Sequence, residues 1–176
     1  MTKDRTEAIR QMQQGNPGSF RPLYDAMVEE AMTVALAVLR DRESAKEVLQ
    51  ETFIRVYTHW DRYDPRRDFE PWFFRILLHE CRRYQRKSQR WPIPVEELQL
   101  ASPEEDIPSE VSPLEGMVEA LPPEDRILLQ LKYVQGFSER ELATMLDMHP
   151  GKVKTKLYRL RTKLRQELES RKEDSR

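Results

Sequence analysis

The chain has 176 residues, of which 35% are charged and 38% hydrophobic, so it can form one domain or two small ones with modest cores. Its single cysteine, Cys81, excludes an internal disulfide framework, and no apolar run approaches the ~18 residues that a membrane-spanning helix needs. The formal net charge of -1 excludes a strongly basic or acidic chain overall. Together with an N-terminus that lacks a signal-peptide core, these features lead us to expect a cytoplasmic protein.

Apolar residues at helical spacing predict helices along the first half of the chain, and no useful stretch alternates as a β-strand does. A short helix is expected over residues 6–14 and a longer one over 20–39, with Ser19 as the N-terminal cap of the second. The next helix is expected near Ser44, because Ser44 and Glu47 have the spacing of a capping box. Its inward face is predicted to be the stripe Ala45, Val48, Leu49, Thr52, Phe53, Val56 and Tyr57.

A fourth long helix is predicted over residues 69–86, after a polar loop. It begins with aromatic residues, of which Trp72, Phe73 and Phe74 are expected in the core rather than on the surface. Its C-terminal part is rich in arginine and lysine. Positive charge there also complements the helix dipole, so part of this pattern serves stability.

The composition changes between residues 92 and 119, which hold five prolines, eight acidic residues and no lysine or arginine. This pattern predicts an extended or disordered acidic linker. The flanks are basic: residues 75–91 carry six cations and one acid, and residues 123–168 carry ten cations and six acids. The linker is either a spacer extended by charge repulsion or a nucleic-acid mimic that lies in a basic channel.

A helix-turn-helix is predicted after the linker. A helix that opens at Pro122 and Pro123 is stopped by Gly136, and Ser138 with Glu141 forms a capping box for a short second helix. The apolar face of the first of these helices is expected to be Ile127, Leu128, Leu131 and Val134. A longer helix follows Pro150. This longer helix is the recognition helix of the motif, the one that enters the DNA major groove.

This last helix has one apolar stripe and one cationic face. Its lysines and arginines run from Lys152 to Arg165 without an acid before Glu167. Such a face suits a polyanion, although taken alone it also fits an ordinary solvated surface. The stripe consists of Val153, Leu157, Leu160, Leu164 and Leu168.

Two blocks of the sequence resemble a known family. Residues 121–146 and 153–161 resemble region 4 of bacterial sigma factors of the extracytoplasmic-function (ECF) group of the sigma-70 family. Upstream, residues 45–57 resemble region 2.2 of that group, and residues 72–87 resemble its regions 2.3 and 2.4. The blocks stand in the family's order, on either side of the acidic segment.

The resemblance implies an all-α fold of two small helical domains. Region 2 is expected over residues 1–91 and the region 4 helix-turn-helix over 120–176, joined by an acidic, proline-rich linker over 92–119. The function implied is that of an alternative sigma factor, which binds core RNA polymerase and directs promoter-specific initiation without catalysis of its own. No cofactor and no metal is expected. An anti-sigma factor, often membrane-anchored in the family, is a candidate partner besides polymerase and promoter DNA.

The resemblance also implies site residues. Polymerase would be bound by Glu47, Gln50, Glu51 and Arg55, whose charges suit a charged coiled coil. An opened strand of the −10 element would be held by Arg75, His79, Arg82, Arg83, Arg86 and Lys87, with Trp60 and Tyr63 as candidates for base contact. The −35 element would be read by Lys152, Lys154, Thr155, Tyr158 and Arg159.

The chain departs from the family pattern at three places. Lys46 takes the first position of an acidic pair, and His79 stands where an asparagine is common. The turn before the recognition helix usually begins Gly-Ile-Ser and here begins at Asp147 as Asp-Met-His-Pro. Promoter preference and the details of the polymerase contact depend on these positions, whereas the architecture does not.

Two other functions remain open from the residues alone. A stand-alone helix-turn-helix regulator would bind a duplex site tightly without polymerase. A helical adaptor for acidic proteins would bind DNA negligibly even at low salt, where a phosphate-binding protein binds best. An enzyme fits least, because no nucleophile–base pair or paired carboxylates stand out.

Overall fold

The structure is a computed structural model that describes residues 3–90 and 113–174, and every element in these two stretches is helical. The first stretch contains α1 (Lys3–Gln13), η1 (Pro17–Ser19), α2 (Phe20–Leu39), α3 (Arg42–Thr58), η2 (Trp60–Arg62) and α4 (Phe69–Arg90). The second contains α5 (Pro113–Glu119), α6 (Pro123–Leu129), a π-helical turn η4 (Gln130–Val134), α7 (Glu139–Met145) and α8 (Pro150–Asp174). The prediction of an all-α fold is confirmed. None of the described helices is long and apolar enough to cross a membrane.

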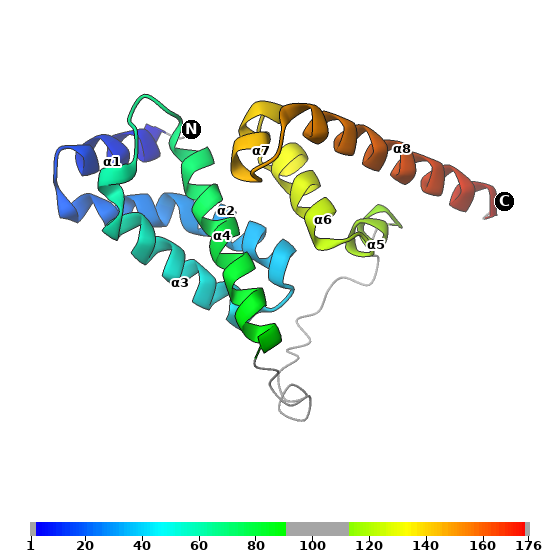
Figure 1. Cartoon of the computed structure of the whole chain (residues 1–176), viewed down its shortest axis with the longest axis horizontal. Coiled ribbons are helices and arrows are strands. Elements are labelled where there is room, and N and C mark those ends of the chain that lie inside the picture. The colour runs from blue at the N-terminus through cyan, green and yellow to red at the C-terminus, as the bar shows by residue number, and fades with distance from the viewer. Residues whose placement is uncertain (1–2, 91–112, 175–176) are drawn as a thin grey trace.

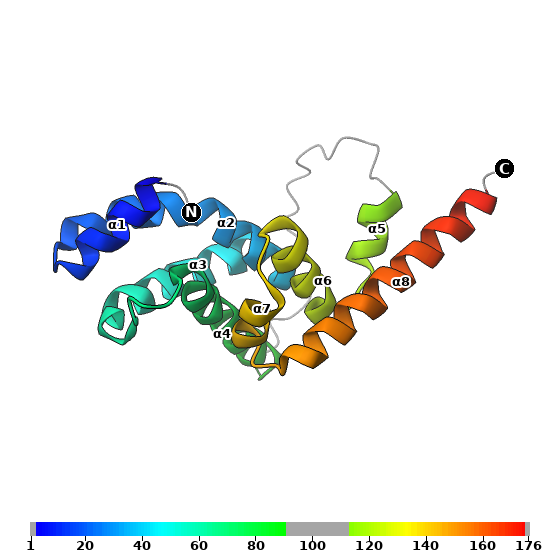
Figure 2. The same ribbon diagram turned by 90° about the horizontal axis from the view of Figure 1, so that it is seen from above.

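The helices form two units that touch each other (Figures 1 and 2). In the first unit α2, α3 and α4 pack on one another, and α1 packs on α2. In the second unit α6, η4 and α7 pack together and α8 lies across α7. The units meet where α6 contacts α2 and α7 contacts α4. The C-terminal part of α8 extends away from the first unit in the two views.

The core of the first unit is built around the aromatic start of α4. Phe69, Phe73 and Phe74 are at most 1% exposed, which confirms the core positions expected for the last two. The Phe73 ring lies 5.3 Å from that of Phe53 on α3, and pairs of this kind contribute about 0.5–1.5 kcal/mol beyond their buried area. Trp72 is only half-buried, so its predicted core position is not fully met.

The structure bears out one of the three predicted caps. The Ser138 hydroxyl accepts from the Glu141 N–H at 3.3 Å, and the Glu141 carboxylate accepts from the Ser138 N–H at 2.7 Å, which is the capping box expected for α7. Ser19 precedes α2 but makes no capping hydrogen bond, because its backbone is helical (φ −77°, ψ −9°) and not in the extended conformation of an N-cap. Its hydroxyl donates to the Gln11 side chain.

The cap of α3 is Asp41 and not Ser44. The Asp41 carboxylate accepts from the Ser44 N–H at 2.7 Å. Hydrogen bonding with the side chain and the backbone of Ser44 lowers the pKa of Asp41. Ser44 is the third residue of α3 rather than its cap, and its hydroxyl donates to the Tyr84 hydroxyl of α4 at 2.9 Å. An acid three residues earlier therefore replaces the predicted capping box.

Two residues predicted to face inward lie on the surface. Tyr57, at the end of α3, is 49% exposed and covers only the edge of the Phe20 ring, 5.1 Å away. Val134 is 65% exposed because it belongs to η4, where a wider π-helical turn shifts residues around the axis relative to the 3.6-residue period. Both side chains belong to exposed apolar surfaces.

The segment expected as a linker is helical at its C-terminal end. Its last seven residues form α5, which contacts α8. Residues 92–112 of that segment lie outside the described residues. The acidic linker is therefore shorter than the composition predicts, at least on this side.

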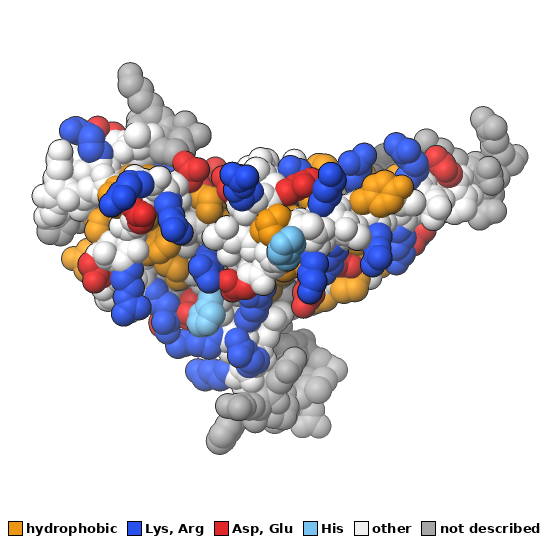
Figure 3. Space-filling model, turned by 45° about the horizontal axis from the view of Figure 1, so that its top comes forward, with side chains coloured by type: hydrophobic (Ala, Val, Ile, Leu, Met, Phe, Trp, Pro, Cys, Tyr) orange, Lys and Arg blue, Asp and Glu red, His pale blue; other side chains and the backbone are white. Residues whose placement is uncertain are grey.

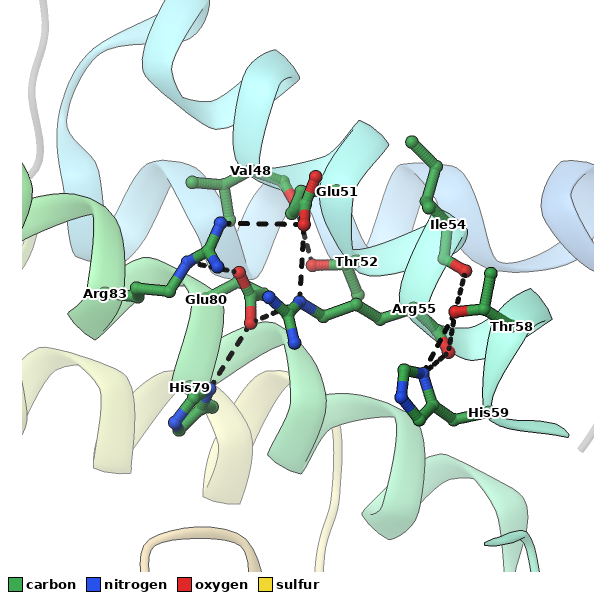
Figure 4. A network of polar contacts seen from close by, with 10 residues as sticks. All are labelled: Val48, Glu51, Thr52, Ile54, Arg55, Thr58, His59, His79, Glu80 and Arg83. Carbon is green, nitrogen blue, oxygen red and sulfur yellow. Dashed lines mark hydrogen bonds and ion pairs between the residues drawn. The ribbon is translucent and has the colours of Figure 1, made fainter. Parts of the chain in front are cut away.

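A polar network joins α3 to α4 on the outside of the first unit (Figure 4). The Glu80 carboxylate, whose side chain is 2% exposed, lies 2.8 Å from Arg55 Nε and 3.1 Å from Arg83 Nε. Glu51 approaches the same two arginines at 3.4 and 3.5 Å, and His79 Nδ1 lies 3.3 Å from Glu80. A buried carboxylate is tolerated here because two guanidinium groups surround it.

Replacing Glu80 by glutamine removes this buried charge and leaves both arginines without their closest partner. We expect Glu80→Gln to lower the free energy of unfolding by about 1–3 kcal/mol. The matched control is Glu51→Gln, a more exposed member of the same network, for which we expect less than about 1 kcal/mol. Urea unfolding followed by circular dichroism measures both, and equal losses in the two variants would contradict the role of Glu80.

Candidate nucleic-acid interface

A cationic cleft of about 360 Å³ lies along the outer face of α4. Its walls come from α3, η2 and α4 and, at one edge, from the turn before α8 in the second unit. The residues that line it are Arg55, His59, Arg62, Trp72, Arg75, Ile76, His79, Glu80, Arg82 and Asp147. A concave surface with this many cations suits an extended polyanion.

The structure brings together three of the six cations predicted for the −10 element. Arg75, His79 and Arg82 line the cleft and are exposed. Arg86 is exposed one turn beyond Arg82, and its Nε donates to the Arg82 carbonyl oxygen at 3.3 Å. These residues form one continuous stripe along α4.

The other two predicted cations face a different side of α4. Arg83 pairs with Glu80 and Glu51, and with Lys87 it lines a separate hollow between α3 and α4. The Arg83 guanidinium is thus engaged within the protein and is less suited to hold a phosphate. The three-residue spacing from Glu80 to Arg83 is the helical signal that could have identified this pair.

The two predicted aromatic contacts are packed in a cluster of rings. Trp60 and Tyr63 are half-buried, with ring centroids 5.5 Å apart, and both pack on Trp72. The Tyr63 hydroxyl donates to the Arg67 carbonyl oxygen at 2.8 Å. Burial, with the nearby charge of Glu70, raises the pKa of Tyr63. These two rings therefore support the wall of the cleft more than they line it.

Trp72 is the aromatic residue that lines the cleft, together with Arg62 and His59, and none of the three was predicted as a site residue. A signal was present for Trp72, because residues 72, 75 and 79 are spaced three and four apart and share one face of a helix. Arg62 and His59 could not be assigned in this way, since they reach the cleft only through the fold of η2.

The second candidate surface is the cationic face of α8. Its apolar stripe packs inward, with Val153 fully buried and Leu157, Leu160 and Leu164 at most 9% exposed. The opposite face is exposed, and Figure 3 shows lysine and arginine side chains continuing from the body of the molecule along the α8 arm. The five predicted −35 readers, Lys152, Lys154, Thr155, Tyr158 and Arg159, are all exposed on α8.

The unusual turn before α8 has a clear local structure. His149 Nδ1 accepts from the Gly151 N–H at 3.2 Å, so the imidazole takes the role of an N-terminal cap. Pro150 follows at the first helical position, where its missing N–H costs nothing. Asp147 adopts a φ of 54°, in the left-handed region.

Lys156 differs from the other cations of α8. Its ammonium lies 2.8 Å from Asp125 and 3.3 Å from Glu124, both at the start of α6. Burial lowers the pKa of Lys156, but its hydrogen bonds and ion pairs with these two acids outweigh that effect, so the pKa is raised overall. This lysine fixes α8 on α6 and is not a candidate DNA contact.

The predicted polymerase contacts divide into two pairs. Glu47 and Gln50 are exposed, whereas Glu51 and Arg55 are partly buried in the network with Glu80. Beside them lies an apolar groove of about 570 Å³ between α2 and α3. Its rim includes Gln50, Ile54 and Tyr57, and the last two are 48% and 49% exposed. The sequence did not indicate this surface, because Tyr57 continues the buried stripe.

A second apolar groove, of about 710 Å³, lies between the two units. It is lined by residues of α2, α5, α6, η4 and α8, among them the exposed Leu114, Tyr133 and Val134. Arg40 and Arg161 stand among the lining residues. Among the residues that the structure describes, no group of three or more His, Cys, Asp or Glu side chains is placed to hold a metal ion.

Comparison with known proteins places these surfaces in a family. Residues 23–91 match Sigma-70 region 2, and residues 113–164 match Sigma-70, region 4. The ECF RNA polymerase sigma factor SigW of Bacillus subtilis is 27% identical over 91% of this chain and 94% of its own length. CnrH, solved in complex with the cytosolic domain of CnrY, superposes with a TM-score of 0.68 at 24% identity, over 95% of this chain and 97% of that one.

A second solved structure has the same fold. The sigma factor RpoE of Bartonella quintana, in complex with the anti-sigma factor NepR, superposes with a TM-score of 0.67 at 18% identity, over 85% of this chain and 96% of that one. The two matched regions together cover most of the chain and correspond to the two helical units. The chain therefore belongs to the sigma-70 family as an ECF sigma factor, a non-catalytic RNA polymerase subunit that directs transcription initiation.

Proposed function

We propose that this sigma factor directs core RNA polymerase to its promoters by holding the −10 element in the α4 cleft and the −35 element on α8. The observation that carries the proposal is the presence of two cationic surfaces on separate helical units of one sigma-70 chain. Linking two weak DNA contacts raises their combined affinity through effective concentration. The proposed division is region 2 over residues 1–91 and region 4 from α5 onward, so that the linker expected over 92–119 ends before Pro113, where α5 and the region 4 match begin. The proposed site of action is the cytoplasm, where polymerase and promoter meet.

The α4 cleft suits a DNA strand that has left the duplex. Arg75 and Arg82 are exposed on the cleft side of α4, away from its buried face. In this position they can bind successive phosphates. Trp72, which is half-buried and lines the cleft, is the aromatic residue on which an unpaired base can stack. Base stacking and phosphate contact together are what distinguishes a strand-capturing cleft from a plain basic patch.

The α8 face suits readout of a duplex major groove. Lys152, Lys154 and Arg159 are exposed near the N-terminal end of the helix, which is the part of a recognition helix that reaches base edges. Lysine and arginine donate to guanine O6 and N7, and the Thr155 methyl group can contact a thymine methyl. Arg161 and Arg165, further along, are placed for phosphates.

For core polymerase we propose the exposed part of α3 and its apolar groove. Glu47 and Gln50 supply polar contacts, and Ile54 with Tyr57 supplies an apolar centre, as in a typical protein interface. Glu51 and Arg55, predicted as contacts, would act mainly by fixing α3 on α4. This revision follows from their bonds to Glu80 and Arg83.

An anti-sigma factor is the further partner that we propose. CnrH and RpoE were solved in complex with CnrY and NepR, respectively. In this chain the groove between the two units is lined by apolar residues from both, including the half-buried Leu36 of α2 and the exposed Val134 of η4. A partner seated there would contact both units at once.

Run-off transcription with purified core polymerase tests the proposed function. We expect transcripts from a subset of promoters of the source genome that appear only when the chain is added. If no promoter of that genome gives such a transcript, the proposal fails. A palindromic footprint from the chain alone would instead indicate a stand-alone regulator.

The proposed polymerase face predicts a loss of binding for Tyr57→Ala. Truncating a large aromatic at the centre of an interface typically costs about 2 kcal/mol, which is a reduction of more than tenfold in affinity for core polymerase. Thr33→Ala, an exposed change on α2, is the control and should bind as the parent does. Fluorescence anisotropy of the labelled chain with core polymerase measures both, and parent-like affinity of Tyr57→Ala would remove this residue from the interface.

The proposed −35 readout predicts a sequence-dependent loss for Lys154→Ala and Arg159→Ala. Each should cost about 1–3 kcal/mol at a matched promoter if it makes a bidentate base contact, and less at an unrelated duplex. Arg165→Ala is the control, since a phosphate contact weakens binding to all sequences alike. Gel-shift titrations of the holoenzyme on both duplexes measure the difference. An equal loss on both duplexes would reassign the residue to phosphate contact.

A further inference from the structure

The cationic cleft of the first unit contains one acid that belongs to the second unit. Asp147, in the turn between α7 and α8, lines the cleft, and its Oδ1 lies 2.6 Å from the Arg75 guanidinium. The two residues are 72 positions apart in the sequence. The Asp147 carboxylate thus pairs with Arg75, which is the first of the residues proposed to bind DNA phosphates.

The backbone at Asp147 gives the carboxylate added meaning. The Met148 N–H donates to the Ala143 carbonyl oxygen at 2.9 Å, so Asp147 is the left-handed residue that ends α7, with a φ of 54°. Glycine is the usual residue at such a position because it has no Cβ to strain. What aspartate adds here beyond glycine is the carboxylate that contacts Arg75.

Two further contacts hold the units together around this ion pair. The Phe137 ring packs on Phe74 of α4 with centroids 5.5 Å apart. Arg126 Nε donates to the Ala37 carbonyl oxygen of α2 at 3.2 Å. The Arg75–Asp147 pair differs from both, because its side chains are 53% and 59% exposed. An exposed ion pair is weak and is readily displaced by a competing anion.

The packed arrangement does not allow both promoter elements to be bound. Lys152 follows Asp147 by five residues, so the start of the reading face lies within about 18 Å of the cleft even for a fully extended chain. By the positions that name them, the −10 and −35 elements are centred roughly 25 base pairs apart. This is about 85 Å of straight duplex at about 3.4 Å per base pair. The units must therefore separate for the proposed double recognition.

We propose that Asp147 is an internal competitor for DNA phosphate at Arg75, and that it helps to hold the chain closed until a promoter strand replaces it. The importance of the closed form rests on the proposed function, whereas the contact itself does not. In the closed form one phosphate site of the cleft is filled by the protein's own carboxylate. DNA that displaces this carboxylate also removes one of the contacts between the units, so binding and opening favour each other.

The distance between the units tests the closing contact in the full chain. Thr33→Cys on α2 and Thr162→Cys on α8 are exposed positions for a donor and an acceptor dye. Cys81 is buried, and burial raises its pKa to about 12, so a maleimide reacts with the two introduced thiols. We expect lower energy transfer in Asp147→Gly and Asp147→Asn than in the parent. Asp25→Asn, which breaks an ion pair within α2, should leave the transfer unchanged.

DNA binding by the same variants provides the second readout. With a fluorescein-labelled single-stranded oligothymidylate, we expect both Asp147 variants to bind about two- to fivefold more tightly, the range that an exposed ion pair allows. In an Arg75→Gln background the Asp147→Asn substitution should have no effect on energy transfer, because the two residues act as a pair. Unchanged transfer and affinity in both Asp147 variants, or an undiminished effect without Arg75, would overturn the proposal.

These outcomes are separate from those of the proposed function. A chain that opens on Asp147→Gly but supports no run-off transcript upholds the closing contact and rejects the promoter role. A chain that supports transcription while the distance stays the same in Asp147→Gly and Asp147→Asn rejects the closing contact and upholds the promoter role.

Discussion

The structure depends on one helix that is apolar on one side and cationic on the other. The buried side of α4 places Phe69, Phe73, Phe74 and Leu77 in the core, each at most 1% exposed. This side contacts α2 and α3 and also receives α7 from the second unit. Because the side chains of a helix are fixed relative to one another, burying the aromatic face determines where the arginines of the other face stand. Core packing in this protein is thus also the means by which the cleft proposed to bind DNA is positioned.

Charge balance then separates structural from functional arginines. Glu80 is buried between Arg55 and Arg83 and neutralises part of the positive charge where α3 meets α4. Without it, the cations of two adjacent helices would repel one another across the contact. Arg75 pairs instead with Asp147, and Arg82 and Arg86 are exposed. The sequence shows a run of similar cations, and the fold pairs some of them between helices and leaves others exposed.

Features that depend on neighbours along the chain were predictable from the sequence. The helices followed from apolar spacing, and the Ser138–Glu141 capping box formed between residues three positions apart, as their spacing predicts. Ser44 is the contrary case, since Asp41 takes the cap and Tyr84, 40 residues away, takes the hydroxyl. The exposure of Val134 depends on a π-helical turn, which a 3.6-residue period does not anticipate.

The candidate site was predictable in outline but not in its membership. The cationic stripes of α4 and α8 are local patterns, whereas the roles of Glu51, Arg55 and Arg83 depend on pairing between two helices. Trp60 was favoured over Trp72 because it lies nearer the loop in sequence, yet Trp72 on α4 lines the cleft and Trp60 packs against it. The contact of Asp147 with Arg75 joins residues from different units, and no short-range pattern encodes it.

The burial of Cys81 bears on how this protein can respond to oxidants. It is the only cysteine of the chain, it lies fully buried on α4, and its pKa of about 12 keeps the thiol protonated at neutral pH. Oxidants and disulfides that act on thiolates therefore have no cysteine target in this chain while α4 stays folded. If the genes it controls answer to oxidative stress, the sensing chemistry belongs to a partner, and this chain reports only whether that partner is bound.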